Sequence, residues 1–173
     1  MVRSIESVAV IGAGTMGAGI AAASAAAGCR VLILDMNADT VEAALEQVAD
    51  EDRHLVSTGL VDADLEAVSG YDWVCEAIVE DLSVKRDLFS RLEEIRKDGS
   101  VISSNTSGIP LRQISEGMPP RFCSDVAITH FFNPVKVMRL FELVPGEETD
   151  QEVISAFAEF GSSRLGKGVV HAK

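Results

Sequence analysis

The stretch of sequence that decides the fold reads Val8-Ala-Val-Ile-Gly12-Ala-Gly14-Thr-Met-Gly17. An apolar run typical of a buried strand leads into glycines spaced as G-x-G-x-x-G, and an alanine-rich segment follows. In this pattern the first glycine permits a tight turn, the second lets the backbone approach a pyrophosphate, and the third lets a helix pack close to the sheet. The helix that begins there presents unpaired N–H groups and a positive dipole end to phosphates. The sequence therefore predicts a strand–turn–helix unit that binds a dinucleotide.

A second apolar run, from Arg30 to Leu34, ends at Asp35. An acid at the end of the second strand accepts hydrogen bonds from a ribose diol and repels a 2′-phosphate, so Asp35 favours NAD over NADP. The order of strand, glycine pattern, helix, strand and acid is far more specific than the glycines alone. FAD-binding proteins and non-catalytic nucleotide sensors share this order, so it predicts binding and leaves the chemistry open.

Further strand-like runs alternate with helical patterns along the chain. The predicted strands cover 7–11, 30–34, 73–78, 100–104, 125–129 and 140–144, and the predicted helices cover 15–27, 38–49, 82–97 and 151–165. Residues 54–58 predict one more strand, followed by a short helix over 62–68. Strands that alternate with helices predict an α/β fold. We expect a Rossmann-type, doubly wound, mostly parallel sheet in a single domain over residues 1–173.

The composition limits the classes of partner. Hydrophobic residues make up 47% of the sequence and charged residues 24%, as in ordinary globular domains. The formal net charge of −12 argues against nucleic acid or an anionic membrane surface as a partner. The three cysteines, Cys29, Cys75 and Cys123, lie in or beside apolar runs without metal-ligand spacing. We therefore expect reduced core thiols in a cytoplasmic protein, with no metal site.

The second half of the chain carries a dense set of motifs: Glu76-Ala-Ile-Val-Glu80, Lys85, Ser104-Asn-Thr-Ser107, His130-Phe-Phe-Asn133-Pro and Glu142. Together with the glycine turn, these motifs resemble the NAD-binding domain of the 3-hydroxyacyl-CoA dehydrogenase family in order and in rough spacing. The resemblance runs from about Ser7 to His171, nearly the whole chain. It implies an oxidoreductase of fatty-acid β-oxidation that interconverts (S)-3-hydroxyacyl-CoA and 3-oxoacyl-CoA with NAD, and a homodimer for the full-length protein.

Oxidation of a secondary alcohol needs a base for the hydroxyl proton, and histidine suits that task near neutral pH. His130 follows an apolar strand, which places it at a carboxyl end, where open α/β sheets build their sites. Glu142 lies on the next apolar run and is positioned to reach the other ring nitrogen. Alone, the histidine is more often structural and the glutamate a strand-edge charge. The resemblance assigns them as a catalytic dyad and places Ser107 near both substrate and cofactor.

The predicted site therefore has two parts. The catalytic residues are His130, Glu142 and Ser107, and the cofactor-binding residues are Gly12, Gly14, Thr15, Met16, Gly17, Asp35, Glu80, Lys85, Asn105, Ser107 and Asn133. Apart from the resemblance, Ser107 has a structural alternative as a cap of the short helix after Pro110, and Asn105 is equally a turn former. On the same terms, Glu80 is a helix-start acid and Lys85 a solvated lysine.

The sequence departs from the family pattern in two places. Asp35 and Glu76 are only 41 residues apart, so a helical hairpin that helps the family to grip CoA is shortened or absent. The segment 166–171 resembles the last strand before the family's helical C-terminal domain, which we expect after residue 173. The chain is then a fragment or one part of a longer polypeptide, with one function or several. Two other readings remain open: a hydroxyacid dehydrogenase with a lysine catalyst, and a non-catalytic NAD-binding module.

Overall fold

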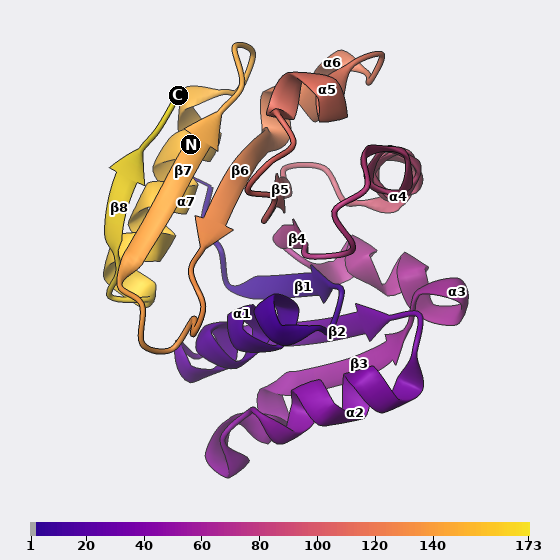
Figure 1. Ribbon diagram of the computed structural model, residues 1–173, viewed down its shortest axis with the longest axis vertical. Helices are drawn as coiled ribbons and strands as arrows, with labels where there is room; N and C mark the ends of the chain where they lie inside the picture. The colour runs from indigo at the N-terminus through magenta and orange to yellow at the C-terminus, as the bar shows by residue number, and fades with distance from the viewer. Residues whose placement is uncertain (1–2) are drawn as a thin grey trace.

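The computed structural model describes residues 3–173, which form an eight-stranded sheet with helices on both faces (Figure 1). The strands are β1 (Ser7–Ile11), β2 (Arg30–Asp35), β3 (Val56–Leu60), β4 (Trp73–Glu76), β5 (Val101–Ser104), β6 (Val126–Phe131), β7 (Leu140–Pro145) and β8 (Gly168–His171). The helices are α1 (Thr15–Ala26), α2 (Ala38–Glu46), α3 (Val61–Asp64), α4 (Leu82–Ile95), α5 (Leu111–Ser115), α6 (Pro120–Asp125) and α7 (Gln151–Glu159). Short 3-10 turns cover Asp50–Leu55 and Leu65–Gly70, and a π turn covers Phe160–Arg164.

The strands lie in the order β3-β2-β1-β4-β5-β6-β7-β8. The six strands from β3 to β6 in this order are parallel, β7 is antiparallel to β6, and β8 is parallel to β7. The chain runs outward from β1 to β3 and then returns to place β4 beside β1, so the winding direction reverses there. Ligands of open α/β sheets bind outside the carboxyl ends of the strands at such a switch point. The Rossmann-type, mostly parallel sheet predicted from the sequence is confirmed.

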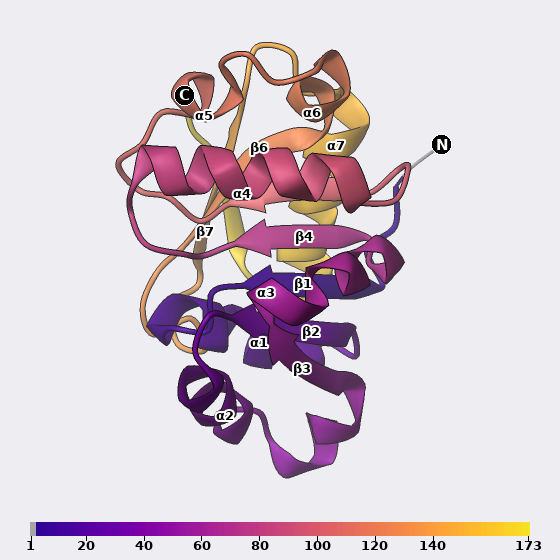
Figure 2. The same cartoon turned by 90° about the vertical axis from the view of Figure 1, so that its right-hand side faces the viewer.

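Two hydrophobic clusters cover the two faces of the sheet. One contains α1, α2 and α7, and the other contains α3, α4, α5 and α6, on the opposite face (Figures 1 and 2). Alternate side chains of β1 lie on opposite faces of the sheet: Val8 and Val10 belong to the first cluster, while Ala9 and Ile11 belong to the second. Because both faces are covered, every residue of β1 is buried, which explains its continuous apolar run.

Several element ends differ from the sequence prediction. The predicted strand 73–78 ends at Glu76, because the Glu76 carboxylate accepts the Ile78 N–H at 2.7 Å and turns the chain out of the ladder. The predicted helix 151–165 ends at Glu159 and continues as the π turn. Gly161 lies within this turn, where an added Cβ would come within 3.0 Å of Phe141. The segment 54–58 forms β3 at Val56–Leu60, two residues later than predicted.

The three cysteines carry free thiols. Cys29 and Cys75 are buried as expected, and burial raises the pKa of the Cys75 thiol to about 12. Cys123 is only half-buried, so the expectation of a core position was wrong for this residue. No helix between residues 3 and 173 has the length and apolar character needed to cross a membrane. Within the same range, no group of three or more His, Cys, Asp or Glu side chains is arranged to hold a metal ion.

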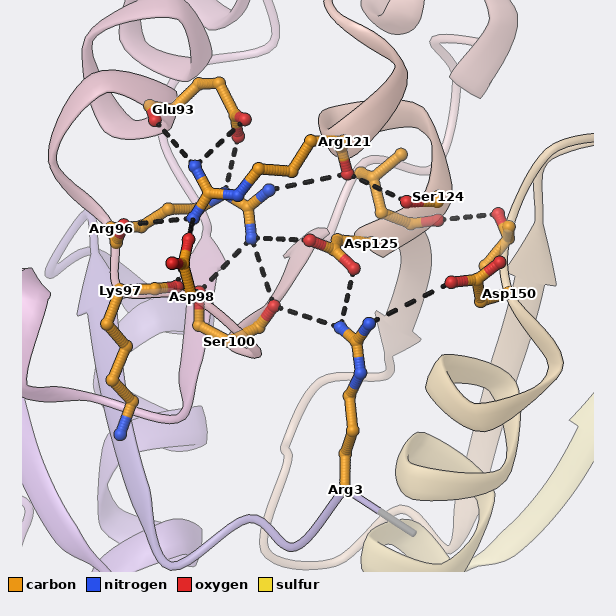
Figure 3. A network of polar contacts seen from close by, with 12 residues as sticks. Arg3, Glu93, Arg96, Lys97, Asp98, Ser100, Arg121, Ser124, Asp125 and Asp150 are labelled. Atoms are coloured by element: carbon orange, nitrogen blue, oxygen red, sulfur yellow. Dashed lines mark hydrogen bonds and ion pairs between the residues drawn. The ribbon is translucent and has the colours of Figure 1, made fainter. Parts of the chain in front are cut away.

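A network of charged side chains joins the amino ends of the strands, at the edge opposite the switch point (Figure 3). Asp125, directly before β6, accepts from Arg3 at 2.6 Å and pairs with Arg96 at 2.9 Å. Arg96 follows α4, its side chain is fully buried, and its Nε donates to Glu93 at 2.5 Å. Arg121 of α6 reaches the other oxygen of Glu93 at 3.2 Å. The network therefore ties α4, α6 and the start of β6 to the N-terminal segment.

The contact between α1 and the glycine turn yields a first prediction. A Cβ added at Gly17 would lie 1.7 Å from the Gly12 carbonyl oxygen, so G17A must push the helix away from the turn. A Cβ added at Gly14 meets no protein atom within 4 Å, so that position is open toward a ligand. We expect G17A to lower the free energy of unfolding by about 1–3 kcal/mol or more. G14A should leave stability nearly unchanged and weaken NADH binding, because its methyl group occupies the space above the turn.

Thermal melts and NADH titrations of the two variants check this pair. A stable G17A protein would contradict the packing argument, whereas a G14A protein with undiminished NADH affinity would contradict the assignment of the open side to a phosphate.

Candidate active site and cofactor-binding site

The glycine turn lies at the switch point between β1 and β4. Gly12 has a φ of +101°, a left-handed conformation that glycine adopts without steric cost, and an added Cβ would approach the Ala77 carbonyl oxygen to 2.4 Å. Gly14 is the N-cap of α1, so the N–H groups of the first helical turn, at Thr15, Met16 and Gly17, have no partner from a preceding turn. This end of α1 therefore offers an anion a set of backbone donors and a positive dipole end.

Asp35 is the last residue of β2, and its carboxylate is held beside the glycine turn. One carboxylate oxygen accepts the Ala13 N–H at 2.7 Å, and the other accepts the Asn37 N–H at 3.0 Å. Asp35 also lines a pocket of about 390 Å³ together with Gly12 and Gly14. The turn and the acid that the sequence predicts as cofactor contacts thus share one cavity.

The walls of this pocket are mainly apolar. Met36 is 63% exposed and Val79 is 65% exposed, and both line the pocket together with the half-exposed Val84. Large hydrophobic side chains left this exposed gain from covering by a ligand. The apolar slot suits a flat base, the acid beside it suits a ribose, and the helix N-terminus suits a pyrophosphate. These three groups make up a dinucleotide.

His130 and Glu142 lie directly opposite each other across the antiparallel pair β6 and β7. The Nδ1 atom of His130 lies 2.9 Å from Oε2 of Glu142, and both side chains are partly buried. Because the carboxylate can only accept, Nδ1 carries the proton in the neutral ring, and Nε2 retains its lone pair. Both residues line a cleft of about 1050 Å³. The pairing proposed from the sequence is present in the geometry.

The structure brings Ser107 into the same cleft and places the two predicted asparagines elsewhere. Ser107 is exposed in the turn after β5 and lines the cleft with His130. Asn105 accepts the backbone N–H of Phe131 at 2.9 Å through its side-chain oxygen, so it holds the chain beside His130. Asn133 lies in a groove of about 390 Å³ with Thr15, at the start of α1. Met16 is half-buried and packs against the hydrophobic core.

Glu80 and Lys85 occupy different environments. The Glu80 side chain is 46% exposed, whereas the Lys85 side chain is 1% exposed and forms ion pairs with Glu80 at 3.2 Å and with Glu76 at 2.6 Å. Desolvation raises the pKa of Glu80, but the hydrogen bond from Thr106 and the Lys85 ammonium outweigh it and hold that pKa below its ordinary value. The solvated lysine expected without the resemblance is therefore wrong for Lys85.

Sequence reasoning missed Glu76 and Thr106 as members of this site. A signal was available in α4, where Lys85 shares a helical face with the buried residues Leu88, Phe89 and Leu92. A lysine on the core-facing stripe of a helix needs a buried carboxylate partner. Glu76, in the middle of an apolar stretch, is the acid that this pattern calls for.

The parallel sheet, the glycine turn at its switch point and the acid after β2 define a dinucleotide-binding domain of the Rossmann type. The family model described as "3-hydroxyacyl-CoA dehydrogenase, NAD binding domain" matches residues 7–173. The chain belongs to this family and is an NAD-binding domain of it.

Named relatives agree with this assignment. A "Probable 3-hydroxyacyl-CoA dehydrogenase" from Deinococcus radiodurans is 41% identical over 97% of this chain and 53% of its own length. A "3-hydroxybutyryl-CoA dehydrogenase" from Mycobacterium tuberculosis is 36% identical over 98% of this chain and 64% of its own length. The crystal structure of M. tuberculosis FadB2 superimposes with a TM-score of 0.88 at 34% identity, covering 98% of this chain and 64% of that one.

The chain spans only part of these relatives. It covers about half of the D. radiodurans protein and 26% of a "Probable 3-hydroxyacyl-CoA dehydrogenase" from Bacillus subtilis, to which it is 34% identical. A large share of each relative therefore lies outside the region shared with this domain.

Proposed function

We propose that this domain serves an NAD-dependent dehydrogenase that interconverts (S)-3-hydroxyacyl-CoA and 3-oxoacyl-CoA in fatty-acid β-oxidation. The observation that carries the proposal is the 2.9 Å contact between His130 Nδ1 and Glu142 Oε2 at the wall of a large cleft. That contact leaves Nε2 as a base for a hydroxyl proton. NAD, when bound, supplies the acceptor for the hydride that leaves the same carbon.

In this proposal His130 takes the hydroxyl proton on Nε2, and Glu142 fixes the ring tautomer and stabilises the imidazolium that forms. Ser107 donates its hydroxyl to the substrate oxygen, because it lines the same cleft and makes no hydrogen bond within the described residues. In the reductive direction the imidazolium returns the proton to the same oxygen. These three residues are the proposed catalytic residues.

We propose that the cofactor half of the site lies at the glycine turn and Asp35, on the β1 and β2 side of the switch point. Gly12, Gly14 and Gly17 shape the turn, and the N–H groups of Thr15 and Met16 face the pyrophosphate. Asp35 accepts hydrogen bonds from the ribose, and the apolar pocket beside it takes the base. Asn105 and Asn133 complete the proposed direct contacts. The family resemblance also assigns Glu80 and Lys85 to the cofactor, and because Lys85 is enclosed between Glu76 and Glu80, we propose that this pair serves the cofactor through the turn 105–108.

The rest of the protein is also part of the proposal. We propose that a helical C-terminal domain follows residue 173, that it closes the cleft over an acyl-CoA thioester, and that it forms a homodimer contact. Relatives at 34% and 32% identity are named "Putative fatty acid oxidation complex trifunctional enzyme", which supports a place in a longer polypeptide. Free thiols at the three cysteines fit a cytoplasmic location.

The test is a titration of the chain with NADH, followed by NADH oxidation with acetoacetyl-CoA, with and without the proposed C-terminal domain. We expect NADH binding by the chain alone and turnover that rises when the second domain is supplied. NADH binding without turnover in either form would leave a non-catalytic NAD-binding module. Turnover of a free hydroxyacid but not of the thioester would point to a different hydroxyacid dehydrogenase.

The preference for NAD over NADP provides a further prediction at Asp35. We expect D35A to weaken NADH binding and to narrow the discrimination against NADPH by about tenfold, because the carboxylate no longer repels a 2′-phosphate. Titrations of both nucleotides into wild-type and variant protein measure the two dissociation constants. D39A, which removes an exposed acid from the first turn of α2, is the control. Equal NADPH discrimination in D35A and wild type would contradict the assigned role.

A further inference from the structure

The ammonium of Lys85 is almost fully enclosed, which is unusual for a lysine on a surface helix. Its Nζ lies 2.6 Å from Oε1 of Glu76 and 3.2 Å from Oε2 of Glu80. Taking a charge out of water carries a large penalty unless partners replace the solvent, and two carboxylates do so here. A buried ion group of this kind fixes the positions of the chain segments to which its carboxylates are hydrogen-bonded.

Glu76 connects the lysine to the carboxyl edge of the sheet. The residue is fully buried at the end of β4, in register with Ile11 of β1 and Ser104 of β5. Its Oε1 also accepts the Ile78 N–H at 2.7 Å, and its Oε2 accepts the Ser104 hydroxyl at 2.5 Å. The Glu76 carboxylate is therefore bonded to the segment beside the glycine turn on one side and to β5 on the other.

Glu80 connects the lysine to the turn that carries Ser107. Its Oε1 accepts the hydroxyl of Thr106 and the backbone N–H of Gly108, the latter at 3.2 Å. The Thr106 hydroxyl in turn accepts the Ile109 N–H at 3.0 Å, and its backbone N–H donates to Ser104. The residues on both sides of Ser107 are thus held by one carboxylate, while the Ser107 side chain stays directed at the cleft.

We propose that Glu76, Lys85, Glu80 and Thr106 form a positioning network that holds the turn 105–108 in its binding geometry before any ligand arrives. The proposal rests on the proposed function, since it assumes that Asn105 and Ser107 meet the cofactor and the substrate. Lys85 then acts through Glu80 and the turn. None of the four residues needs to touch the reacting atoms.

The test uses the pair T106V and T106S. Valine keeps the volume of Thr106 but removes the hydroxyl that bonds to Glu80 and Ile109, while serine keeps the hydroxyl. We expect faster hydrogen exchange of the Gly108 and Ile109 amides in T106V. We also expect NADH binding about fivefold to tenfold weaker, because the turn must then be ordered at each binding event. T106S should bind NADH within about twofold of wild type.

The matched control is T149V. The Thr149 hydroxyl also holds a turn, since it accepts the Gly146 N–H at 2.8 Å and donates to the Val126 carbonyl at 2.7 Å, at the amino end of β6. We expect T149V to loosen its own turn without changing the NADH affinity. E80Q is the second variant should T106V fail to fold, because the Glu80 side chain is nearly half exposed and glutamine keeps an acceptor for Thr106. E80Q loses the negative charge that faces Lys85, so we expect it to bind NADH more weakly than wild type, as T106V does.

Two outcomes would contradict the proposed positioning role. One is that T106V and E80Q proteins bind NADH as wild type does, and the other is that a T149V protein loses as much NADH affinity as T106V. Failure of wild type to bind NADH would end both this inference and the cofactor half of the proposed function. NADH binding without acetoacetyl-CoA turnover would end only the proposed dehydrogenase reaction, since the affinity comparison does not depend on turnover.

Discussion

We expect H130Q protein, supplied with the proposed C-terminal domain, to retain NADH binding and to lose the proposed acetoacetyl-CoA-dependent NADH oxidation, with kcat lowered by about 10²–10⁴-fold. Glutamine preserves much of the size and polarity of the side chain but offers no basic nitrogen near neutral pH, so the proton transfer loses its partner. The cofactor pocket beside Asp35 is lined by other residues, and the dissociation constant for NADH should therefore stay within about twofold.

Steady-state rates with saturating substrate, together with an NADH titration, measure the two quantities. H54Q is the matched control, because His54 is an exposed histidine whose Nδ1 contacts the Glu51 carbonyl oxygen at 2.8 Å, on a 3-10 turn. Its kcat should equal that of wild type. An H130Q enzyme that keeps most of its activity would remove His130 as the base and favour a hydroxyacid dehydrogenase with another catalyst.

D125L is the second large effect, and it concerns stability. The change removes the carboxylate that pairs with Arg3 and Arg96 and leaves the fully buried Arg96 guanidinium with one acidic partner, Glu93. Loss of one member of a buried ion group costs about 3–5 kcal/mol, and we expect the free energy of unfolding to fall by that amount. The NADH affinity of the folded D125L protein should not change, because the network lies at the edge of the sheet opposite the cofactor pocket.

Urea unfolding followed by the fluorescence of Trp73, the one tryptophan in the sequence, measures the stability. Trp73 is fully buried and packs edge-on against Phe157 and Phe160, so its emission reports on the core. D98A is the control, since Asp98 is fully exposed in its pair with Arg121, and its midpoint should match wild type. Equal midpoints for D125L and wild type would show that the network contributes nothing to folding.

The first half of the fold was predictable because its signals are local. The glycine spacing, the apolar runs and Asp35 each depend on neighbours in the sequence, and β1 matches its prediction at both ends. The segment 50–70 was harder, since it consists of short turns around β3 with few buried residues. After α7, Gly161 lies where an added Cβ would come within 3.0 Å of Phe141, a constraint that only the tertiary arrangement shows.

The candidate site divides in the same way. His130 and Glu142 were paired from motifs, but their contact requires β7 to run antiparallel to β6 in one register, which no local pattern specifies. Asn105 is held by Phe131, 26 residues further along the chain, and Lys85 by the buried Glu76 of β4, nine residues before it. Burial and hydrogen-bond partners of this kind come from the tertiary arrangement, so the sequence alone could name these residues without placing them.

The charged network of Figure 3 lies at the amino ends of β5 and β6, whereas the pocket with the glycine turn and Asp35 lies at the carboxyl ends of β1 and β2. Substitutions that alter thermal tolerance can therefore accumulate at the amino rim while the carboxyl rim keeps its ligand geometry, and the reverse also holds. Distant sites without shared partners combine additively, so a substitution at Asp125 or Arg96 and one in the pocket beside Asp35 should have additive effects on the free energy of unfolding.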